Sequence, residues 1–382
     1  YILPKRPYLS VPYALEALAQ ARQVSFILGD FPIPLEYRPN PTAGIAHPPK
    51  NLSVLDVRNN PVMTQEEPKP FSALSEKALE RIKTELEEGG RVVVLATRKG
   101  YAPAVVCRDC GQAQTDERGV PLLFSTAHEE RVFISRDGVS VLNAKRTCTR
   151  CESWNLLPLG IGVERVEEEL RKAFPDRDIT VLTAEALTSR KAAKNSVEDA
   201  QRPGSILVGT EALLPWMLTY EGPPGLRPLG VIASADSLLS LPFWRARERF
   251  IRLSYFMSGL CHELLLLTRR PEDSAVQSLS SSATGTPEVS FWSEETALRK
   301  ALSYPPYGTL ITLSYEGPSA ALEKFHAQIK SDLNQYSPSI LPGQGTVVFS
   351  LPENVWPNME LSSYLRELPP QVRVRIDPES LW

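Results

Sequence analysis

Four of the five cysteines of this chain form two Cys-x-x-Cys pairs, Cys107/Cys110 and Cys148/Cys151. Four thiolates held two by two match the tetrahedral coordination that zinc prefers, and a site whose four ligands all come from the protein is closed. The pattern therefore predicts a structural zinc site rather than a catalytic one. Four basic residues flank the pairs and would offset the double negative charge of a zinc tetrathiolate: Arg108, Lys145, Arg146 and Arg150.

Two other uses of the cysteine pairs stay open, a disulfide pair and a redox dithiol. The sequence shows no signal peptide, and an intracellular location disfavours disulfides. Neither pair opens a helix of a thioredoxin-like unit. The segment between Cys110 and Cys148 is longer than the usual spacing of a zinc ribbon and must fold back as a hairpin or loop. The fifth cysteine, Cys261, lies in an apolar stretch at 256–267 and is expected to be a buried core thiol.

The composition is that of a globular chain. Its 382 residues, 42% of them hydrophobic, suffice for about two to four domains with real cores. The net charge of −3 provides no overall attraction to nucleic acid, so any DNA contact must come from local basic patches. The longest apolar runs, 92–96 and 264–267, are too short to cross a bilayer, which predicts a soluble protein without a membrane partner. The first residue is Tyr1 rather than Met, so we expect the chain to begin inside a larger protein.

Apolar runs of strand length alternate with helical patterns through most of the chain. A helix is predicted over 11–22, followed by a buried strand over 24–29. Further strands are predicted over 52–57, 91–98, 179–183, 205–209, 230–235 and 263–268. One helix is predicted to begin at Ser72, with Ser75 and Glu76 near its start and Gly89 at its end, and another over 163–174 after a turn at 160–162. The alternation predicts an α/β fold with a parallel sheet, which a Ser-rich stretch at 278–286 separates from a final α+β unit over 289–382.

Several short motifs occur in an order similar to that of the PriA family of bacterial primosomal replication-restart helicases. They are RKGYAP at 98–103 with CRDCG at 107–111, LG at 159–160 with VERVEEEL at 163–170 and FP at 174–175, ILVGTE at 206–211, GV at 230–231 with ADS at 235–237, Phe243, RER at 247–249, YPPYG at 304–308 and VRIDPES at 374–380. Each motif alone is weak, but their joint order is specific. The chain thus resembles the C-terminal part of the family over nearly its whole length.

The resemblance implies a RecA-like second helicase lobe with a parallel sheet, an inserted four-cysteine zinc module and a C-terminal α+β domain. It divides the chain into the end of a first helicase-like lobe (1–60), the start of the second lobe (61–104), the zinc insert (105–158), the remainder of the second lobe (159–285) and the C-terminal domain (286–382). The segment 24–34 would correspond to the end of the first motor lobe.

The chain departs from the family where the family's chemistry lies. The family's zinc module carries eight cysteines and two zinc ions, whereas here the inner four cysteines are replaced across 115–143, so we expect one zinc. GDFPIP at 29–34 replaces a Ser-Ala-Thr-Pro-Ser-like coupling loop, and ALLPW at 212–216 replaces a Lys-Gly-His-Asp-like element. SYFMSGL at 254–260 stands where an arginine-rich Gln-x-x-Gly-Arg-x-Gly-Arg motif is expected.

The missing arginine motif bears on catalysis. Its arginine stabilises charge on the transferring phosphate, and arginine fingers in related chemistry contribute roughly 10³ to 10⁵ in rate. Its absence implies a degenerate, non-hydrolysing branch of the family, of the kind associated with actinobacteria. The chain also has no Gly-x-x-x-x-Gly-Lys-Ser/Thr phosphate loop and no paired acidic motif for magnesium. Those elements would lie before Tyr1, which leaves binding of ATP and Mg²⁺ open.

Basic and aromatic residues at a strand end are the first candidates for DNA contact. Arg98 and Lys99 could meet phosphates and Tyr101 could stack on a base, with a solvated loop as the alternative. Asp236 also follows a strand, but a structural role is the preferred interpretation. The histidines form no metal-spaced cluster and are expected to be ordinary surface or core residues: His47, His128, His262 and His326.

A second group of candidates flanks the second cysteine pair. Arg146, Arg150 and Trp154 could contact DNA or a partner protein, with packing of Trp154 against the metal site as the alternative. A third group lies on one predicted helix and is expected to form an interdomain surface, since acids such as Glu248 can pair with its arginines. Its members are Trp244, Arg245, Arg249 and Arg252.

The main functional prediction is a PriA-like replication-restart and primosome-assembly protein with little or no helicase activity. It would bind branched or single-stranded DNA, recruit primosome or replication proteins, carry one Zn²⁺, and act in the cytoplasm in association with the nucleoid. Two alternatives stay open. One is an active ATP-dependent 3′–5′ DNA helicase whose nucleotide site lies upstream of this chain, and the other is a zinc-stabilised scaffold that binds only proteins.

Overall fold

The computed structural model divides into two compact units. One consists of Tyr1–Ala46 and Val289–Trp382, and the other of His47–Glu288. All residues are described except 1–10, 30–32, 38–48, 59–71, 97–103, 108, 111–113, 118–121, 129, 136–139, 144–145, 160, 184–201, 218–226, 240–243, 281–286, 318, 342–344 and 379–382.

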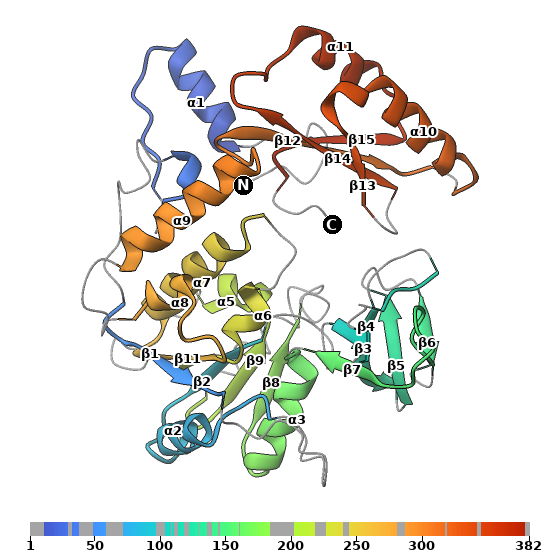
Figure 1. The fold of residues 1–382 in the computed structure, drawn as a ribbon. Coiled ribbons are helices and arrows are strands. Elements are labelled where there is room, and N and C mark those ends of the chain that lie inside the picture. The colour runs from blue at the N-terminus through green and yellow to red at the C-terminus, as the bar shows by residue number, and fades with distance from the viewer. Residues whose placement is uncertain are drawn as a thin grey trace. The chain divides into compact units, whose positions relative to one another are not determined.

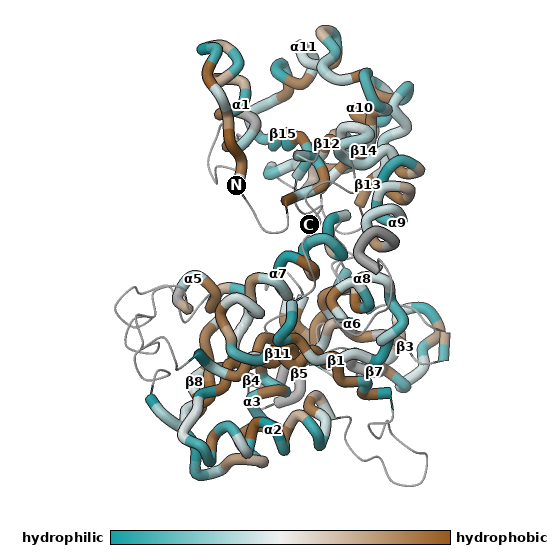
Figure 2. The backbone as a smooth tube through the Cα atoms, turned by 90° about the vertical axis from the view of Figure 1, so that its left-hand side faces the viewer, coloured by the Kyte–Doolittle hydropathy of each residue, from teal (hydrophilic) through white to brown (hydrophobic). Residues whose placement is uncertain are grey.

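The unit His47–Glu288 is built on a six-stranded parallel sheet with the strand order β1-β11-β10-β2-β9-β8. Its strands are β1 (Leu52–Asp56), β2 (Val92–Leu95), β8 (Ile179–Leu182), β9 (Ile206–Gly209), β10 (Leu229–Ile232) and β11 (Glu263–Thr268). Every residue of β2, β9 and β10 is buried, and Figure 2 shows the strand β11 of this sheet as hydrophobic. Strands that are apolar on both faces need cover on both sides, which is the usual setting of a parallel sheet.

Helices cover both faces of this sheet (Figure 1). They are α2 (Glu76–Glu87), α3 (Val163–Ala173), α5 (Leu214–Met217), α6 (Ala235–Leu239), α7 (Ala246–Leu260) and α8 (Ser274–Gln277), with the 3-10 turn η3 (Glu211–Leu213). α2 and α3 lie on one side, where Ile82 and Leu170 share a core with Val94 and Val208. α6, α7 and α8 lie on the other side. The predicted helix is confirmed as α2, but it begins at Glu76 rather than at Ser72, because Ser75 caps it by accepting a hydrogen bond from the N–H of Ala78.

A small β-module follows β2 in the chain and precedes α3. β3 (Ala104–Cys107) pairs antiparallel with β7 (Leu156–Leu159), and β4 (Leu122–His128), β5 (Glu130–Ser135) and β6 (Val141–Asn143) form an antiparallel meander. Its core includes Val105, Leu122, Phe124 and Phe133, with the two phenylalanine rings 5.9 Å apart. The long segment between the two cysteine pairs therefore folds back as hairpins, as predicted.

The other unit combines an antiparallel sheet with helices, which confirms the predicted α+β class. The sheet order is β13-β14-β12-β15, from β12 (Gly308–Tyr315), β13 (Ser339–Ile340), β14 (Thr346–Pro352) and β15 (Val372–Ile376). Its helices are α1 (Val11–Ala21), α9 (Pro287–Ala301), α10 (Leu322–Asp332) and α11 (Met359–Glu367), with the 3-10 turns η1 (Leu35–Tyr37), η4 (Ser319–Ala321) and η5 (Asn334–Tyr336). Residues of α10 and α11 share a core with the sheet: Phe325, Ile329 and Leu361 with Ile311 and Phe349.

The structure differs from the sequence prediction in the first sixty residues. The predicted buried strand at 24–29 is wrong, since this segment is irregular and Val24 and Ile27 are 59% and 90% exposed. Within the described residues the segment has no strand beside it, so neither a ladder nor a core supports an extended strand there.

The strand β1 is predicted to lie in the end of a first lobe over 1–60. In the structure it pairs with β11 and so belongs to the main sheet. Asn51 explains this placement: its carbonyl accepts from the N–H of Leu264, and its side chain donates to the carbonyls of Ser258 and Cys261, each at 3.0 Å. The strand start is thereby tied to the end of α7. In the described part of the chain we find no helix whose length and apolar content would suit a membrane span.

Candidate metal centre

Two antiparallel strands bring the cysteine pairs together. Cys107 is the last residue of β3 and lies opposite Leu156, the first residue of β7. Cys110 lies in the turn that follows β3, and Cys148 and Cys151 lie in the turn that precedes β7. The pairing of β3 with β7 therefore sets one Cys-x-x-Cys turn against the other.

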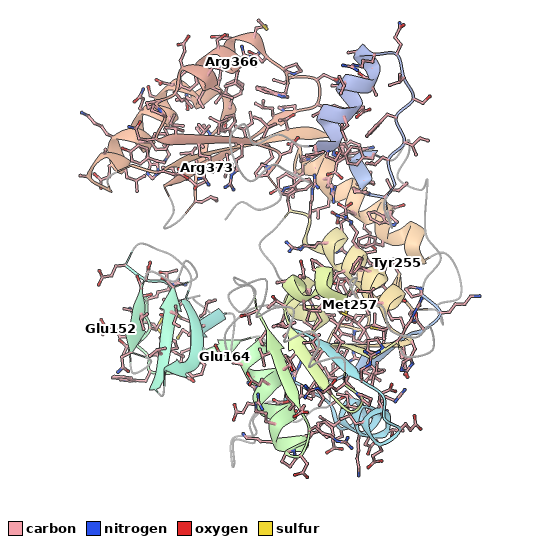
Figure 3. All side chains as sticks on the ribbon, turned by 180° about the vertical axis from the view of Figure 1, so that it is seen from behind. Glu152, Glu164, Tyr255, Met257, Arg366 and Arg373 are labelled. Atoms are coloured by element: carbon pink, nitrogen blue, oxygen red, sulfur yellow. The ribbon has the colours of Figure 1, made fainter. Side chains whose placement is uncertain are left out.

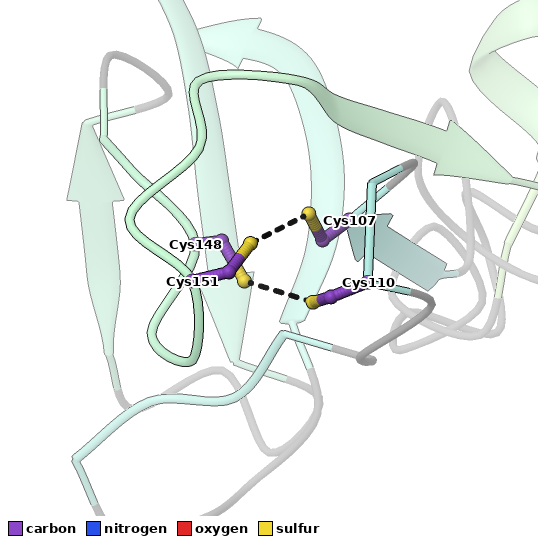
Figure 4. A group of neighbouring side chains, drawn as sticks. All are labelled: Cys107, Cys110, Cys148 and Cys151. Atoms are coloured by element: carbon purple, nitrogen blue, oxygen red, sulfur yellow. Dashed lines mark hydrogen bonds between the residues drawn. The ribbon is translucent and has the colours of Figure 1, made fainter.

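The four sulfur atoms form a compact cluster, with all Sγ atoms within 4.8 Å of one another (Figure 4). The Sγ atoms of Cys107 and Cys151 are 3.5 Å apart, and those of Cys110 and Cys148 are 3.6 Å apart. Four thiolates bound to zinc at about 2.3 Å would have their sulfurs about 3.8 Å apart by tetrahedral geometry. The cluster thus fits a tetrahedral metal ion such as zinc. In the part of the chain that the structure describes, no other group of three or more potential ligands lies so close together.

The cysteines of the cluster form no disulfide bond. Bonded sulfurs lie about 2.05 Å apart, which is far shorter than the separations here, and all five cysteines are free. Neither pair opens a helix among the described elements, so the setting of a thioredoxin-like dithiol is absent from them.

The thiols of the cluster differ in acidity. Burial acts to raise the pKa of Cys148, but backbone N–H groups of its own turn, the Cys110 thiol and the Gln114 amide outweigh it and lower the pKa to about 6. The pKa of Cys151 is raised to about 12, because the neighbouring thiols and burial outweigh the Ser153 N–H, which lowers it. Cys148 is therefore deprotonated before Cys151. A bound cation would stabilise a second thiolate beside it.

Gln114 connects the two halves of the cluster. Its side-chain N–H donates to the Sγ of Cys148 at 3.3 Å, and its Oε1 accepts from the N–H of Thr149 at 3.1 Å. Its backbone N–H donates to the carbonyl of Val105 in β3 at 2.8 Å, and the residue is 1% exposed. Groups of this kind orient metal ligands. The sequence analysis missed Gln114, because a single glutamine outside both pairs has no characteristic spacing.

A second link between the two turns was also missed. The Asp109 carboxylate accepts hydrogen bonds from the Ser153 hydroxyl and, at 2.9 Å, from the Asn155 amide. Ser153 in turn closes its own turn, since its carbonyl accepts from the N–H of Cys148 at 2.8 Å. Turn-forming residues beside both cysteine pairs were the available signal, but their pairing across the site depends on the fold.

The candidates for DNA contact are distributed unevenly. Arg98, Lys99 and Tyr101 lie outside the described residues. Arg146 is half-buried and Arg150 is exposed, both in the segment that carries the second cysteine pair. The packing alternative for Trp154 is wrong, since this residue is 72% exposed.

The other residues singled out from the sequence have contacts within their own unit, and the interdomain surface predicted for Trp244, Arg245, Arg249 and Arg252 stays a prediction. Trp244 is 8% exposed with Arg245 stacked 4.2 Å from its ring, and Arg249 donates to both oxygens of Glu211 at 3.1 Å. The Asp236 carboxylate accepts from the Thr268 hydroxyl at 3.0 Å, in keeping with the structural role expected of it. Cys261 is confirmed as a buried core thiol with 0% exposure, and burial raises its pKa to about 12.

Comparisons with known proteins point to one group of relatives. No protein-family profile matches the chain. Replication restart protein PriA of Bacillus subtilis is 29% identical over 266 residues, which is 64% of this chain and 30% of that protein. The proteins of the same name from Haemophilus influenzae and Thermotoga maritima are 26% and 28% identical, over 66% and 72% of this chain and 33% and 36% of their own lengths.

The chain thus spans about a third of the length of the curated relatives it matches. Similarity of this extent agrees with the architecture, in which an α/β unit with a six-stranded parallel sheet carries a cysteine cluster that could hold a metal ion. Together these findings identify the chain as PriA-like, similar to the C-terminal part of the replication restart proteins of that name.

Proposed function

We propose that the chain acts in replication restart as a PriA-type DNA-binding protein without helicase activity of its own. It would bind branched or single-stranded DNA and recruit primosome or replication proteins, in the cytoplasm beside the nucleoid. The observation that carries this proposal is the similarity to proteins named for replication restart over 64% to 75% of the chain.

The proposal includes one zinc ion, held by Cys107, Cys110, Cys148 and Cys151. The chain has five cysteines, and Cys261 is buried elsewhere in the fold. With four protein ligands the ion would have no open position for a substrate, so its part is to join the two turns. Gln114 and Asp109 support the same junction through hydrogen bonds.

The absence of helicase activity is proposed from the segment 254–260, where the resembling family carries its arginine motif. This segment forms the C-terminal half of α7 and contains no arginine. Tyr255 and Met257, both labelled in Figure 3, are 5% and 0% exposed, so they serve the packing of the helix. These positions therefore offer no guanidinium group that would stabilise charge on a phosphate during transfer.

The test compares binding of the zinc-loaded chain to labelled forked, single-stranded and duplex DNA. We expect a preference for forked or single-stranded DNA over duplex, and affinity that falls steeply as salt rises, because phosphate contacts release counterions. ATP hydrolysis measured in the same preparation should not respond to DNA.

Three outcomes would contradict the proposal. Equal affinity for forked and duplex DNA would reject the recognition of branched or unpaired DNA. ATP turnover stimulated by DNA would instead favour the active helicase. Failure to bind any of the three DNAs, with zinc present, would favour a scaffold that binds only proteins.

A further inference from the structure

Among the tryptophans whose side chains the structure describes, Trp154 has the most exposed ring. It is 72% exposed, whereas Trp244 and Trp292 are 8% and 0% exposed and Trp356 is half-buried. Singly exposed apolar side chains are common, but Trp is highly buried on average and its large ring dominates the energetics of binding interfaces, which makes Trp154 a candidate contact residue.

The backbone that presents Trp154 is held from both sides. Its neighbours Ser153 and Asn155 both donate side-chain hydrogen bonds to Asp109, which belongs to the other cysteine turn. The carbonyl of Trp154 itself accepts from the N–H of Leu156, the first residue of β7, at 2.8 Å. A backbone fixed in this way loses little conformational freedom when a ligand stacks on the ring that it carries, so the residue is suited to binding.

The polar surroundings of Trp154 narrow the class of ligand. Arg150 is exposed on the same turn, Arg146 lies just before it, and Glu152 (Figure 3) is the one acid in the segment 146–155. Trp and Arg are both frequent in protein interfaces, but the residues on either side of Trp154 in the chain, Ser153 and Asn155, are polar. That setting suits a ligand that offers a flat face for stacking and negative charge beside it.

The charge balance further favours single strands over duplex. The four basic residues near the cysteine pairs would be offset by the two negative charges of a metal tetrathiolate and by the carboxylates of Asp109 and Glu152, so charge alone provides little attraction here. Stacking must then contribute much of the binding, and it requires base faces that a duplex hides.

We propose that Trp154 is a stacking platform for an unpaired base of single-stranded DNA, with Arg150 contacting an adjacent phosphate. This inference rests on the proposed function. It names an unpaired base as the part of the DNA that the β-module with the cysteine cluster binds.

The test uses the zinc-loaded chain and a labelled oligothymidylate. Trp154→Ala should weaken binding about 5- to 150-fold, the range expected for the loss of one stacked base, without changing the salt dependence. Trp154→Phe should keep most of the affinity. Arg150→Gln should weaken binding and lower the slope of log affinity against log salt by about 0.7. Met359→Ala, which removes another exposed apolar side chain (85% exposed) from α11, should bind as the unsubstituted chain does.

Two further measurements separate stacking from a loss of structure. Zinc content and circular dichroism of Trp154→Ala should match those of the unsubstituted chain. An oligonucleotide with abasic sites should bind both proteins equally, since it offers phosphates without bases. Photocross-linking with 5-iodouracil in the oligonucleotide should map to Trp154.

The results would overturn the inference in distinguishable ways. If the unsubstituted chain binds oligothymidylate and Trp154→Ala binds it equally well, the stacking platform is rejected, the surface is better assigned to a protein partner, and the proposed function survives. If the unsubstituted chain binds no DNA at all, the proposed function and this inference both fail.

Discussion

At the scale of single residues, Cys148 is the proposed metal ligand whose sulfur accepts hydrogen bonds from both a side-chain amide and a backbone N–H. It is 1% exposed, and its sulfur accepts hydrogen bonds from the Gln114 amide and from the N–H of Arg150. Cys148→Ser should lose the metal and loosen β3 to β7, because a closed zinc site contributes on the order of 10 kcal/mol of apparent binding energy. Zinc content by mass spectrometry and amide hydrogen exchange would show both effects.

Cys261→Ala provides the matched control, since it removes the one cysteine outside the cluster. It should keep a full complement of zinc, and exchange in the six-stranded sheet of Cys148→Ser should remain slow. Full zinc content in Cys148→Ser would reject its assignment as a ligand.

The acidity of the same thiols predicts how zinc affinity depends on pH. The pKa of Cys148 is lowered to about 6, so above pH 6 this thiol has already lost its proton, and below pH 6 zinc must displace it. The pKa of Cys151 is raised to about 12, so its proton is displaced on both sides of pH 6. The logarithm of affinity should therefore fall more steeply below pH 6, by about one further unit per pH unit. Competition with a chromophoric chelator measures this, and a constant slope through pH 6 would contradict the prediction.

At the scale of elements, Glu169 ties the segment before α2 to α3. Its carboxylate accepts from the Ser72 hydroxyl and from the N–H groups of Ala73, at 2.7 Å, and Leu74, at 3.0 Å. Glu169→Gln should lower the free energy of unfolding by about 1.5–3 kcal/mol, because an amide keeps only one acceptor oxygen and lacks the charge that strengthens these hydrogen bonds. Urea unfolding followed by circular dichroism would measure the change.

The neighbouring Glu168→Gln is the control for this prediction. Glu168 forms an exposed pair with Lys172, whose side chain is 72% exposed, and such pairs contribute about 0–1 kcal/mol. Equal effects of the two substitutions would show that the hydrogen bonds of Glu169 add nothing to stability.

At the scale of the whole molecule, residues far apart in the sequence share one buried ion-pair cluster. Arg299 of α9 donates to Glu295 at 2.9 Å and lies 3.8 Å from Glu36 of η1, and all three side chains are at most 1% exposed. The cluster joins the segment before residue 46 to the C-terminal part of the same unit. Arg299→Met should destabilise this unit by about 3–5 kcal/mol, because it leaves buried carboxylates without their cation.

Limited proteolysis of the unit formed by Tyr1–Ala46 and Val289–Trp382 would follow this effect. Arg366→Met is the comparison, since Arg366 is an exposed residue of α11 in the same unit (Figure 3). Arg299→Met with the protease resistance of Arg366→Met would contradict a stabilising role for the cluster.

Local sequence patterns were sufficient for the strands of the main sheet and for the four cysteines. The predicted strand at 263–268 matches β11, and α2 begins within a few residues of the predicted start at Ser72, since apolar runs and capping residues act within a few positions. The run at 24–29 shows the limit of such patterns, because a strand also needs a neighbour to accept its hydrogen bonds.

Other features depended on how distant segments meet. Asn51 places β1 beside β11, Gln114 and Asp109 join the two cysteine turns, and Glu36 reaches Arg299 near the other end of the chain. Trp154 is exposed because its neighbours are engaged by Asp109 instead of a core. Each of these is a contact between residues far apart in the sequence, and no pattern of local spacing encodes the partner. The chain's own pattern therefore specified the strands of the main sheet and the four paired cysteines, while packing specified strand order, the supporting hydrogen bonds and the exposure of Trp154.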